Sequence, residues 1–257
     1  MSFKNKLKNK NIIKGTMLRN ILNPLIISFI AESKLDFVVI DLEHGSCSLN
    51  ELQNLVLISK NYNISLIVRP ESSNSENIAK YLDTGINGIL APNIESFKQI
   101  EFLIRTSKYK PIGNRSYGIS IEFFKFDKKF ENKQNIINYL NENQVIILQI
   151  ESKKGIELIS ELFSQKKDIL NLIDGIIIGP ADLSLDLEIF EDYENPEFDE
   201  YALKIFEICK NLNKSFGIHF SDFKLIKKWK EKGMNIILYN TIDRILENSL
   251  KDIYKNI

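Results

Sequence analysis

Polar side chains stand where short apolar stretches of this sequence come to an end. The stretches are rich in β-branched residues, as buried strands are, and the active residues of a parallel barrel stand at the carboxyl ends of its strands. The residues found there are Asp41, Glu43, His44, Arg69, Gln149, Glu151 and Asp182. They include acids, a histidine and a fixed cation, so together they could bind a metal ion and move a proton.

Glu151 and Asp182 have the chemistry of metal ligands. They are separated by 182 − 151 = 31 residues, the length of one strand–helix unit, so their carboxylates can be neighbours in space. Carboxylate oxygens are the ligands that Mg²⁺ and Mn²⁺ prefer. Two like charges side by side also need a cation, and a divalent metal ion is the natural one.

Arg69, Asp41 and His44 suit the reacting part of a substrate. The guanidinium group of Arg69 offers a rigid positive fork to an oxyanion. Asp41 lies three residues before His44, so its carboxylate could orient the imidazole as an acid–base pair. None of the apolar stretches ends in lysine, which argues against Schiff-base chemistry.

Each of these residues also has a simpler interpretation when it is taken alone. Asp41 or Glu43 could cap a helix or charge a loop. Arg69 could form a surface salt bridge, and Asp182 could cap the helix that follows it. It is the density of polar groups at these positions that favours a functional site.

Other reactive residue types lie outside this set. His219 lies within an apolar stretch and is interpreted as a barrel-core or loop histidine. Cys47 is close to His44, but nothing else indicates a thiol nucleophile, and Cys47 and Cys209 belong to no CxxC pair. Arg115, in PIGNRSYG, could bind an anion or steady its loop.

A regular alternation of short strands and amphipathic helices must position these residues. The eight predicted strands are 12–18, 37–43, 65–70, 88–93, 145–152, 175–180, 216–220 and 235–240. The predicted helices are 49–61, 76–85, 96–108, 153–164, 197–213, 222–233 and 243–254. Gly85 and Gly233 stand where two of these helices are expected to end.

Eight such units in 257 residues predict an α/β protein with a single (β/α)8 TIM-barrel domain over residues 1–257. An open, doubly wound sheet would show the same alternation and remains the alternative. The segment 109–140, with the aromatic stretch IEFFKF, is too long for a simple loop. We expect it to hold an extra helix or an active-site flap.

The composition is that of a globular protein, with 44% hydrophobic residues, and excludes wholesale disorder. The 34 basic and 34 acidic residues cancel, so nothing indicates a nucleic-acid partner. The best apolar run, 22–31, is too short to span a bilayer, and no signal peptide is evident. Unpaired thiols suit a reducing compartment, so a cytoplasmic protein without a membrane partner is expected.

Six motifs occur in an order that is specific for one family. They are DFVVIDLEHG (36–45), VRP (68–70), DTGINGILAPNIES (83–96), PIGNRSYG (111–118), QIES (149–152) and GPADLS (179–184). The chain, from about residue 12 to 245, thereby resembles the HpcH/HpaI aldolases. These are metal-dependent, class II pyruvate aldolases, related to 2-dehydro-3-deoxyglucarate aldolase and 4-hydroxy-2-oxoheptanedioate aldolase.

The resemblance implies a TIM barrel in which Glu151 and Asp182 bind a divalent metal ion. Mg²⁺ and Mn²⁺ are the expected metals, with Co²⁺ as a third candidate. Arg69 would stabilise the pyruvate enolate. His44 and Asp41 would form the acid–base dyad of the family and act through a metal-bound water.

The resemblance also assigns the substrate contacts. Gln149 and the backbone around Ala181 and Asp182 would contact pyruvate, and Glu43 would hold Arg69 in place. The chain departs from the family in two places. GTML (15–18) replaces a tryptophan common near the first strand end, and no glycine follows GPADLS. We therefore expect the aldehyde-binding half of the site to differ more than the metal-binding half.

The implied reaction is reversible aldol cleavage of a sugar-acid-like 4-hydroxy-2-oxo acid to pyruvate and an aldehyde, through a metal-bound pyruvate enolate. One alternative is a related metal–enolate lyase, either citrate-lyase-like with a CoA ester or an oxaloacetate decarboxylase. Another is a non-catalytic barrel. The resemblance further implies a homo-oligomer, commonly a hexamer built from dimers that exchange a C-terminal helix. The amphipathic tail 243–257 could pack on such a partner.

Overall fold

Eight parallel strands close into a barrel in chain order, and β1 pairs with both β2 and β8. The computed structural model of the chain describes residues 1–118 and 132–257. The strands are β1 Ile13–Leu18, β2 Phe37–Asp41, β3 Ser65–Arg69, β4 Gly88–Ala91, β5 Val145–Ile150, β6 Gly175–Ile178, β7 Ser215–Phe220 and β8 Ile236–Thr241. All the predicted strands are confirmed, and closure between β1 and β8 excludes the open sheet.

The strands are buried on both faces, which explains why their sequences do not alternate between apolar and polar residues. Side chains such as Met17, Val39 and Ile147 fill the inside of the barrel. A larger apolar cluster lies between the strands and the helices around them, and it includes Trp229 and Phe198. The barrel is therefore a packed core that fixes the positions of its strand ends.

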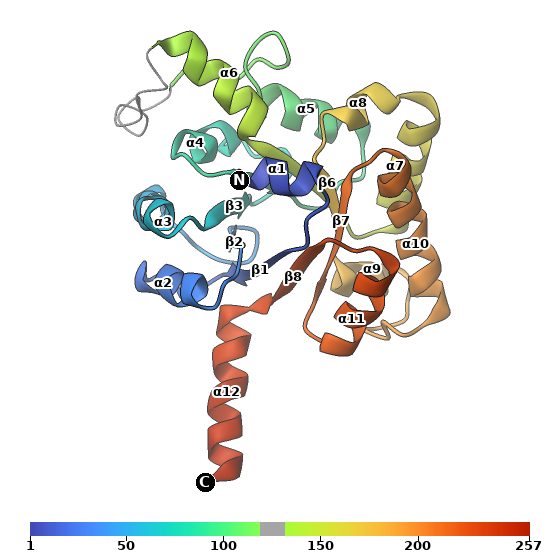
Figure 1. Cartoon of the computed structure of the whole chain (residues 1–257). Coiled ribbons are helices and arrows are strands. Elements are labelled where there is room, and N and C mark those ends of the chain that lie inside the picture. The colour runs from blue at the N-terminus through green and yellow to red at the C-terminus, as the bar shows by residue number, and fades with distance from the viewer. Residues whose placement is uncertain (119–131) are drawn as a thin grey trace.

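Helices surround the barrel, as Figure 1 shows. They are α1 Phe3–Lys8, α2 Leu25–Glu32, α3 Leu49–Tyr62, α4 Ile78–Asp83, α5 Phe97–Ser107, α6 Lys133–Asn143, α7 Lys153–Gln165, α8 Lys167–Asn171, α9 Pro180–Asp186, α10 Pro196–Asn211, α11 Phe223–Lys232 and α12 Ile242–Asn256. The seven predicted helices are confirmed within two residues at either end. Gly233, at φ 115°, ends α11 as expected, and Gly85, at φ 91°, follows the last residues of α4.

Several helices were not predicted because they are short or weakly patterned. α1, α8 and α9 have at most seven residues each, which is about two helical turns. α2 occupies the apolar run that the sequence analysis considered only as a membrane span. α1 covers the amino-terminal end of the barrel, where Phe3 and Leu7 pack with the interior residue Phe37.

The segment 109–140 does contain the start of a helix, α6, while the stretch IEFFKF lies outside the described residues. Arg115 is buried, and its guanidinium group donates to Gln144 at 2.6 Å and pairs with Asp83. It also lies over the ring of Tyr109. Of the two interpretations of Arg115, the structure supports the one in which it steadies its loop.

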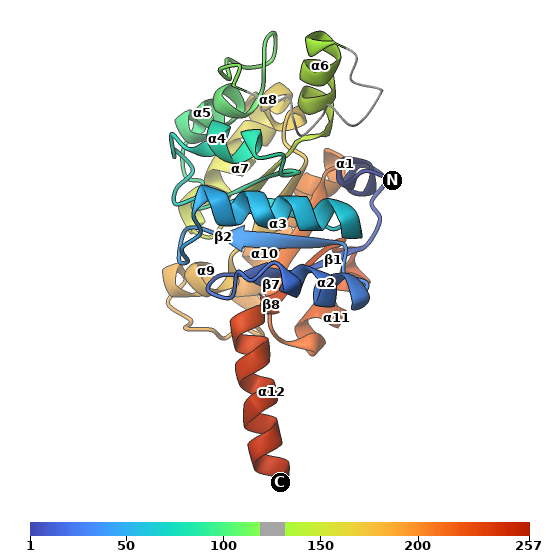
Figure 2. The same ribbon diagram turned by 90° about the vertical axis from the view of Figure 1, so that its left-hand side faces the viewer.

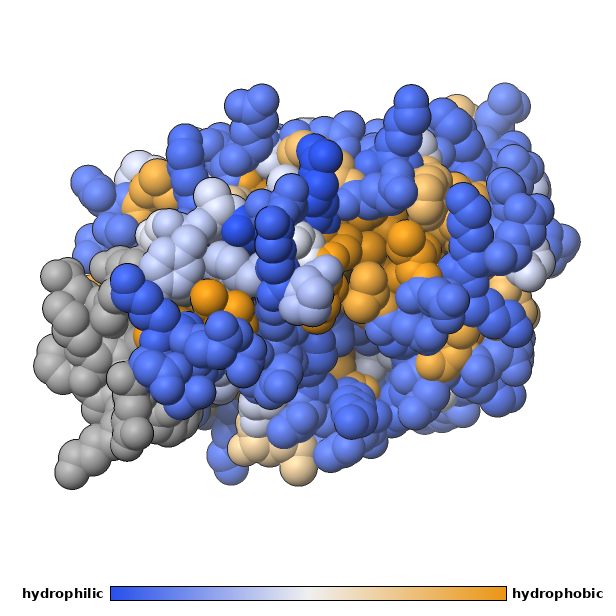
Figure 3. All heavy atoms as spheres, turned by 90° about the horizontal axis from the view of Figure 1, so that it is seen from above, coloured by the Kyte–Doolittle hydropathy of each residue, from blue (hydrophilic) through white to orange (hydrophobic). Residues whose placement is uncertain are grey.

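The surface seen in Figure 3 is mostly hydrophilic, with hydrophobic side chains gathered near its middle. An apolar groove between α5 and α8 is lined by Phe102, Ile104, Ile112, Ile169 and Leu172, among others. Within the described residues, no helix is both long and apolar enough to cross a bilayer.

The cap at the amino-terminal end provides a test of the packing. Leu7 is 2% exposed, so Leu7→Ala should lower the free energy of unfolding by about 2–4 kcal/mol through the cavity that it leaves. Lys8→Ala, at the exposed neighbouring position, is the matched control and should change it little. Urea unfolding measures both. Equal stability of the two variants would mean that α1 does not dock on the barrel.

Candidate active site

The carboxyl ends of the strands surround a cavity of about 300 Å³. A second cavity of about 240 Å³ adjoins it and shares His44 and Asp182. Arg69, Gln149 and Ala181 line the larger cavity, while Glu43 and Glu151 line the smaller one. The predicted residues are thus brought together at one end of the barrel.

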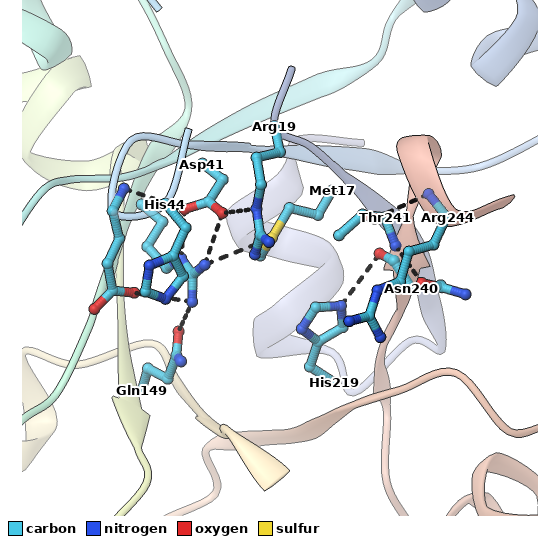
Figure 4. A network of polar contacts seen from close by, with 11 residues as sticks. Met17, Arg19, Asp41, His44, Gln149, His219, Asn240, Thr241 and Arg244 are labelled. Atoms are coloured by element: carbon cyan, nitrogen blue, oxygen red, sulfur yellow. Dashed lines mark hydrogen bonds and ion pairs between the residues drawn. The ribbon is translucent and has the colours of Figure 1, made fainter. Parts of the chain in front are cut away.

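Asp41 is the buried centre of this end of the barrel. It ends β2 directly beside Arg69, which ends β3, and their Cα atoms are paired in the sheet register. Arg69 donates from Nε to Asp41 Oδ1 at 2.9 Å and from Nη2 to Oδ2 at 2.8 Å. The Nε of Arg19 adds a third bond to Oδ2 at 2.8 Å (Figure 4). Two guanidinium groups therefore share one carboxylate that is fully inaccessible to solvent.

The charges around Asp41 are balanced by these contacts. Burial alone would raise the pKa of Asp41, but the hydrogen bonds and charges of Arg69 and Arg19 outweigh it and lower that pKa. Arg69, in turn, lies 3.0 Å from Glu43 through Nη1 and 3.5 Å from the side-chain oxygen of Gln149. The guanidinium group of Arg69 is consequently held in one orientation at the wall of the larger cavity.

Glu151 follows β5 and is also nearly buried. Its Oε1 accepts a hydrogen bond from the backbone N–H of Asn93 at 2.8 Å, and its Oε2 accepts one from the side-chain amide of Gln149. A Cβ atom at position 179 would lie 2.3 Å from Oε2, so any other residue there would displace this carboxylate from its present position. Gly179 therefore forms part of the cradle of Glu151.

The environment of Glu151 is acidic. Burial raises its pKa to about 7, and the negative charges of Glu43 and Asp182 add to that shift. Asp182, in the first turn of α9, is exposed to both cavities. Among the described residues no group of three or more His, Cys, Asp or Glu side chains is arranged to hold a metal ion. Glu151 and Asp182 both line the smaller cavity, so they could hold a cation that takes two carboxylates and fills its other positions with water or substrate oxygens, as Mg²⁺ commonly does.

His44 does not have the partner that the sequence analysis expected. The Asp41 carboxylate accepts a hydrogen bond from the backbone N–H of His44, at 3.4 Å, but does not contact its imidazole. The carboxylate oxygens are instead bonded to the two arginines. The imidazole Nε2 instead lies 3.8 Å from Glu43 Oε2, and the side chain is 53% exposed. The predicted orientation of His44 by Asp41 is thus wrong in this structure, and Glu43 is the nearest carboxylate.

Several residues that line the larger cavity were not predicted from the sequence, among them Arg19, Asn240, Tyr193 and Arg244. Arg19 stands directly after β1, so the rule of reading strand ends would have found it there. Arg244 lies within the first turn of α12, beyond the end of β8, and only the fold brings it to the cavity.

His219 also belongs to this wall, whereas it was interpreted as a core or loop histidine. It lies on β7, and its Nε2 donates to the backbone carbonyl of Asn240 at 3.1 Å, which leaves Nδ1 as an acceptor (Figure 4). Burial lowers the pKa of His219 to about 4, and the charges of Arg69 and Arg19 act in the same direction. The imidazole is therefore neutral at pH 7.

A closed eight-stranded barrel with acids, an arginine and a histidine at its carboxyl end has the architecture of a TIM-barrel enzyme. The model of the HpcH/HpaI aldolase/citrate lyase family matches residues 17–239. The chain belongs to this family, as its six motifs predicted, and is a carbon–carbon lyase.

Individual relatives and solved structures are similar to this chain over nearly its whole length. A hydroxypyruvate/pyruvate aldolase of Pseudomonas aeruginosa is 23% identical over 251 residues, which cover 98% of this chain and 90% of that protein. The crystal structure of an HpcH/HpaI aldolase from Desulfitobacterium hafniense DCB-2 matches with a TM-score of 0.87 and 28% identity, over 99% of this chain and 96% of that one. A citrate synthase, SbnG, matches with a TM-score of 0.82 and 28% identity, over 99% and 98% of the two chains.

The buried ion pair provides a test of this geometry. Asp41→Asn leaves two guanidinium groups without their carboxylate, so it should lower the free energy of unfolding by about 3 kcal/mol at pH 7. Asp199→Asn, which breaks a partly exposed pair with Lys228, should cost less than about 1 kcal/mol.

The pH dependence follows from the lowered pKa of Asp41. Its contribution is fully present above the unfolded pKa of about 3.9 and is lost as the pH falls through the folded value. The stability difference between the wild-type protein and Asp41→Asn should be constant from pH 5 to about 8 and shrink below about pH 4. Urea unfolding across this range measures the difference, and a gap that widened in acid would contradict the assignment.

Proposed function

We propose that this protein catalyses the reversible aldol cleavage of a 4-hydroxy-2-oxo acid to pyruvate and an aldehyde. The observation that carries the proposal is the rigidly held guanidinium of Arg69 beside the carboxylates of Glu151 and Asp182. Positive charge fixed next to a site for a cation suits a reaction in which an enolate oxygen develops.

Glu151 and Asp182 would hold a divalent cation, with Mg²⁺ and Mn²⁺ as the first candidates. Their support is the acidic surroundings of Glu151, whose pKa is raised chiefly by burial and further by the negative charges of Glu43 and Asp182. When bound, the cation would supply Lewis-acid stabilisation to the 2-oxo acid.

The residues of the chain would orient and stabilise pyruvate. Arg69 faces the cavity and would stabilise the developing oxyanion through its N–H groups. Gln149 bonds to both Arg69 and Glu151, so it would keep these two groups at a fixed separation. The backbone N–H groups of Ala181 and Asp182, in the first turn of α9, would donate to the pyruvate carboxylate.

His44 is the candidate for proton transfer to and from the C4 hydroxyl group. It lines both cavities and is half-exposed, so a substrate or a water molecule can reach its imidazole. Glu43 would orient it, in place of Asp41, while Asp41 would act by fixing Arg69.

The charges at the site favour this route over a Schiff base. A Schiff-base enzyme needs a neutral lysine beside the reacting carbon. No lysine lines either of the two cavities in the described part of the chain. The groups present are carboxylates, arginines and histidines, which suit a cation and an oxyanion.

A second candidate is a citrate-type reaction, because the citrate synthase SbnG shares the fold at 28% identity. Turnover that required a CoA ester would favour it. Oxaloacetate decarboxylation without aldol cleavage would favour the related decarboxylase. Metal binding without enolisation of pyruvate would favour a non-catalytic barrel.

We also propose a homo-oligomer in which α12 packs on a second copy of the chain. Helix α12 extends away from the barrel (Figures 1 and 2) and contains no buried residue. Leu246, Leu250 and Ile253 on it are about half exposed. An apolar groove beside its first turns is lined by Ile26, Phe29 and Ile245, among others.

Both cysteines are free, which supports the cytoplasm as the expected compartment.

Removing either carboxylate tests the metal site. Glu151→Gln and Asp182→Asn should abolish aldol cleavage and weaken Mn²⁺ binding by more than the roughly 10–100-fold typical of losing an outer-shell partner. Calorimetry with Mn²⁺ measures this, with the exposed Glu161→Gln as the control. Unchanged affinity in both variants would remove the assignment.

The same variants separate loss of function from loss of fold. The raised pKa of Glu151 means that its ionised form is disfavoured in the metal-free fold above the unfolded pKa of about 4.3. Metal-free Glu151→Gln should therefore be at least as stable as the wild-type protein at pH 8. A clearly less stable variant would show that the carboxylate is mainly structural.

The oligomer is tested at the exposed face of α12. Leu250→Asp places a charge in the proposed contact, so it should shift the protein towards monomers at micromolar concentration. Leu57→Asp, at an exposed position on α3, is the control. Light scattering measures both, and a wild-type protein that is already monomeric would dismiss the idea.

A further inference from the structure

The side chain of His219 faces the inside of the barrel at its carboxyl end. Ile218 and Phe220 belong to the apolar cluster between the strands and the helices, so His219, between them on β7, points to the opposite side. The same alternation on β5 turns Gln149 inward. Both side chains line the larger cavity. His219 therefore stands at the floor of this cavity, across from a residue that would contact pyruvate.

The hydrogen bond of His219 to the backbone decides which ring nitrogen is free. Its Nε2 lies 3.1 Å from the carbonyl oxygen of Asn240, which can only accept, so the proton of the neutral ring is on Nε2. Figure 4 shows Nε2 at Asn240 and the other ring nitrogen on the opposite edge of the ring. No residue that the structure describes donates a hydrogen bond to Nδ1. A lone pair without a protein partner is thus left at the cavity.

The surroundings of His219 restrict what can bind to this lone pair. Burial lowers the pKa of His219 to about 4, and the positive charges of Arg69 and Arg19 add to the shift, although Asp41 opposes it. The charges that disfavour a proton on Nδ1 also disfavour a metal ion there. An anion offers no proton and would be repelled by the lone pair. The partner that fits is a neutral hydrogen-bond donor, and in a small oxygenated substrate this is a hydroxyl group.

The position of His219 indicates which part of the substrate reaches it. Pyruvate would lie against Arg69, Gln149 and the first turn of α9. The rest of the larger cavity is lined by residues of β7, β8 and the loops after them, among them His219, Ser221 and Asn240. The carbon atoms that come from the aldehyde would therefore extend from pyruvate towards β7.

We propose that His219 is a specificity-determining residue, whose Nδ1 accepts a hydrogen bond from a hydroxyl group on the aldehyde-derived half of the substrate. An aldehyde with a hydroxyl group beside its carbonyl would then be used in preference to an alkyl aldehyde of the same size. The alkyl group would displace water from Nδ1 without replacing its hydrogen bond. This inference rests on the proposed aldol reaction and adds a residue that selects its second substrate.

The test compares two aldehydes of similar size. With saturating pyruvate and Mn²⁺, kcat/KM is measured for glycolaldehyde and for propanal, in which a methyl group replaces the hydroxyl group. The wild-type protein should prefer glycolaldehyde by at least about tenfold. His219→Leu should reduce this ratio by about tenfold, through a lower kcat/KM for glycolaldehyde.

Two further variants separate the lone pair from the shape of the side chain. His219→Asn can place an amide oxygen close to the position of Nδ1, so it should keep more of the preference than His219→Leu does. Ser221→Ala removes another polar group that lines the same cavity and is the matched control, which should keep the wild-type ratio.

Three results would overturn the inference. The first is equal use of glycolaldehyde and propanal by the wild-type protein. The second is a wild-type ratio in His219→Leu. The third is an equal loss in His219→Leu and His219→Asn, because the imidazole would then act through its shape.

Exchange of the pyruvate methyl protons with deuterium separates the two proposals. Exchange in the wild-type protein and in His219→Leu, without any preference for glycolaldehyde, would contradict only the inference about His219. The absence of exchange in the wild-type protein would contradict the proposed aldol function itself.

Discussion

The site depends on one buried carboxylate, Asp41, that is shared by two guanidinium groups. An isolated charge so deep in a barrel would cost several kcal/mol, and breaking such a pair is correspondingly unfavourable. The cost is offset because the ends of β2 and β3 place Asp41 and Arg69 side by side in register. From Arg69 the contacts continue through Gln149 to Glu151, so the arginine, the amide and the acid are fixed relative to one another. The rigidity of the site is therefore a property of the barrel.

The acidic part of the site is held by close packing as much as by hydrogen bonds. A Cβ atom at residue 179 would displace the Glu151 carboxylate from its position, and burial, together with the charges of Glu43 and Asp182, makes its ionised form unfavourable in the absence of a cation. A site of this kind gains stability when it binds a positive ion, since the same carboxylates that repel one another then become ligands.

The sequence predicted the barrel and the position of most of the site because both follow from local pattern. Buried strands give β-branched runs, and their carboxyl ends lie at one end of a barrel, so Arg69, Glu151 and Asp182 could be found without a structure. Which side chains bond to one another within the site could not be predicted in this way. Asp41 bonds to arginines instead of the imidazole of His44, because register and side-chain reach decide between neighbours. Arg244 lies far along the chain from Arg69, and only closure of the barrel brings both to one cavity.

The central claim is that Arg69, fixed by Asp41, stabilises the enolate of pyruvate as a planar fork. The most direct measurement is deuterium exchange at the pyruvate methyl group in Arg69→Lys at saturating Mn²⁺, with Mn²⁺ affinity followed by calorimetry. The account predicts that exchange falls by about 100-fold or more, the effect typical of losing one oxyanion donor, while Mn²⁺ affinity changes little. Exchange at close to the wild-type rate in Arg69→Lys would contradict it.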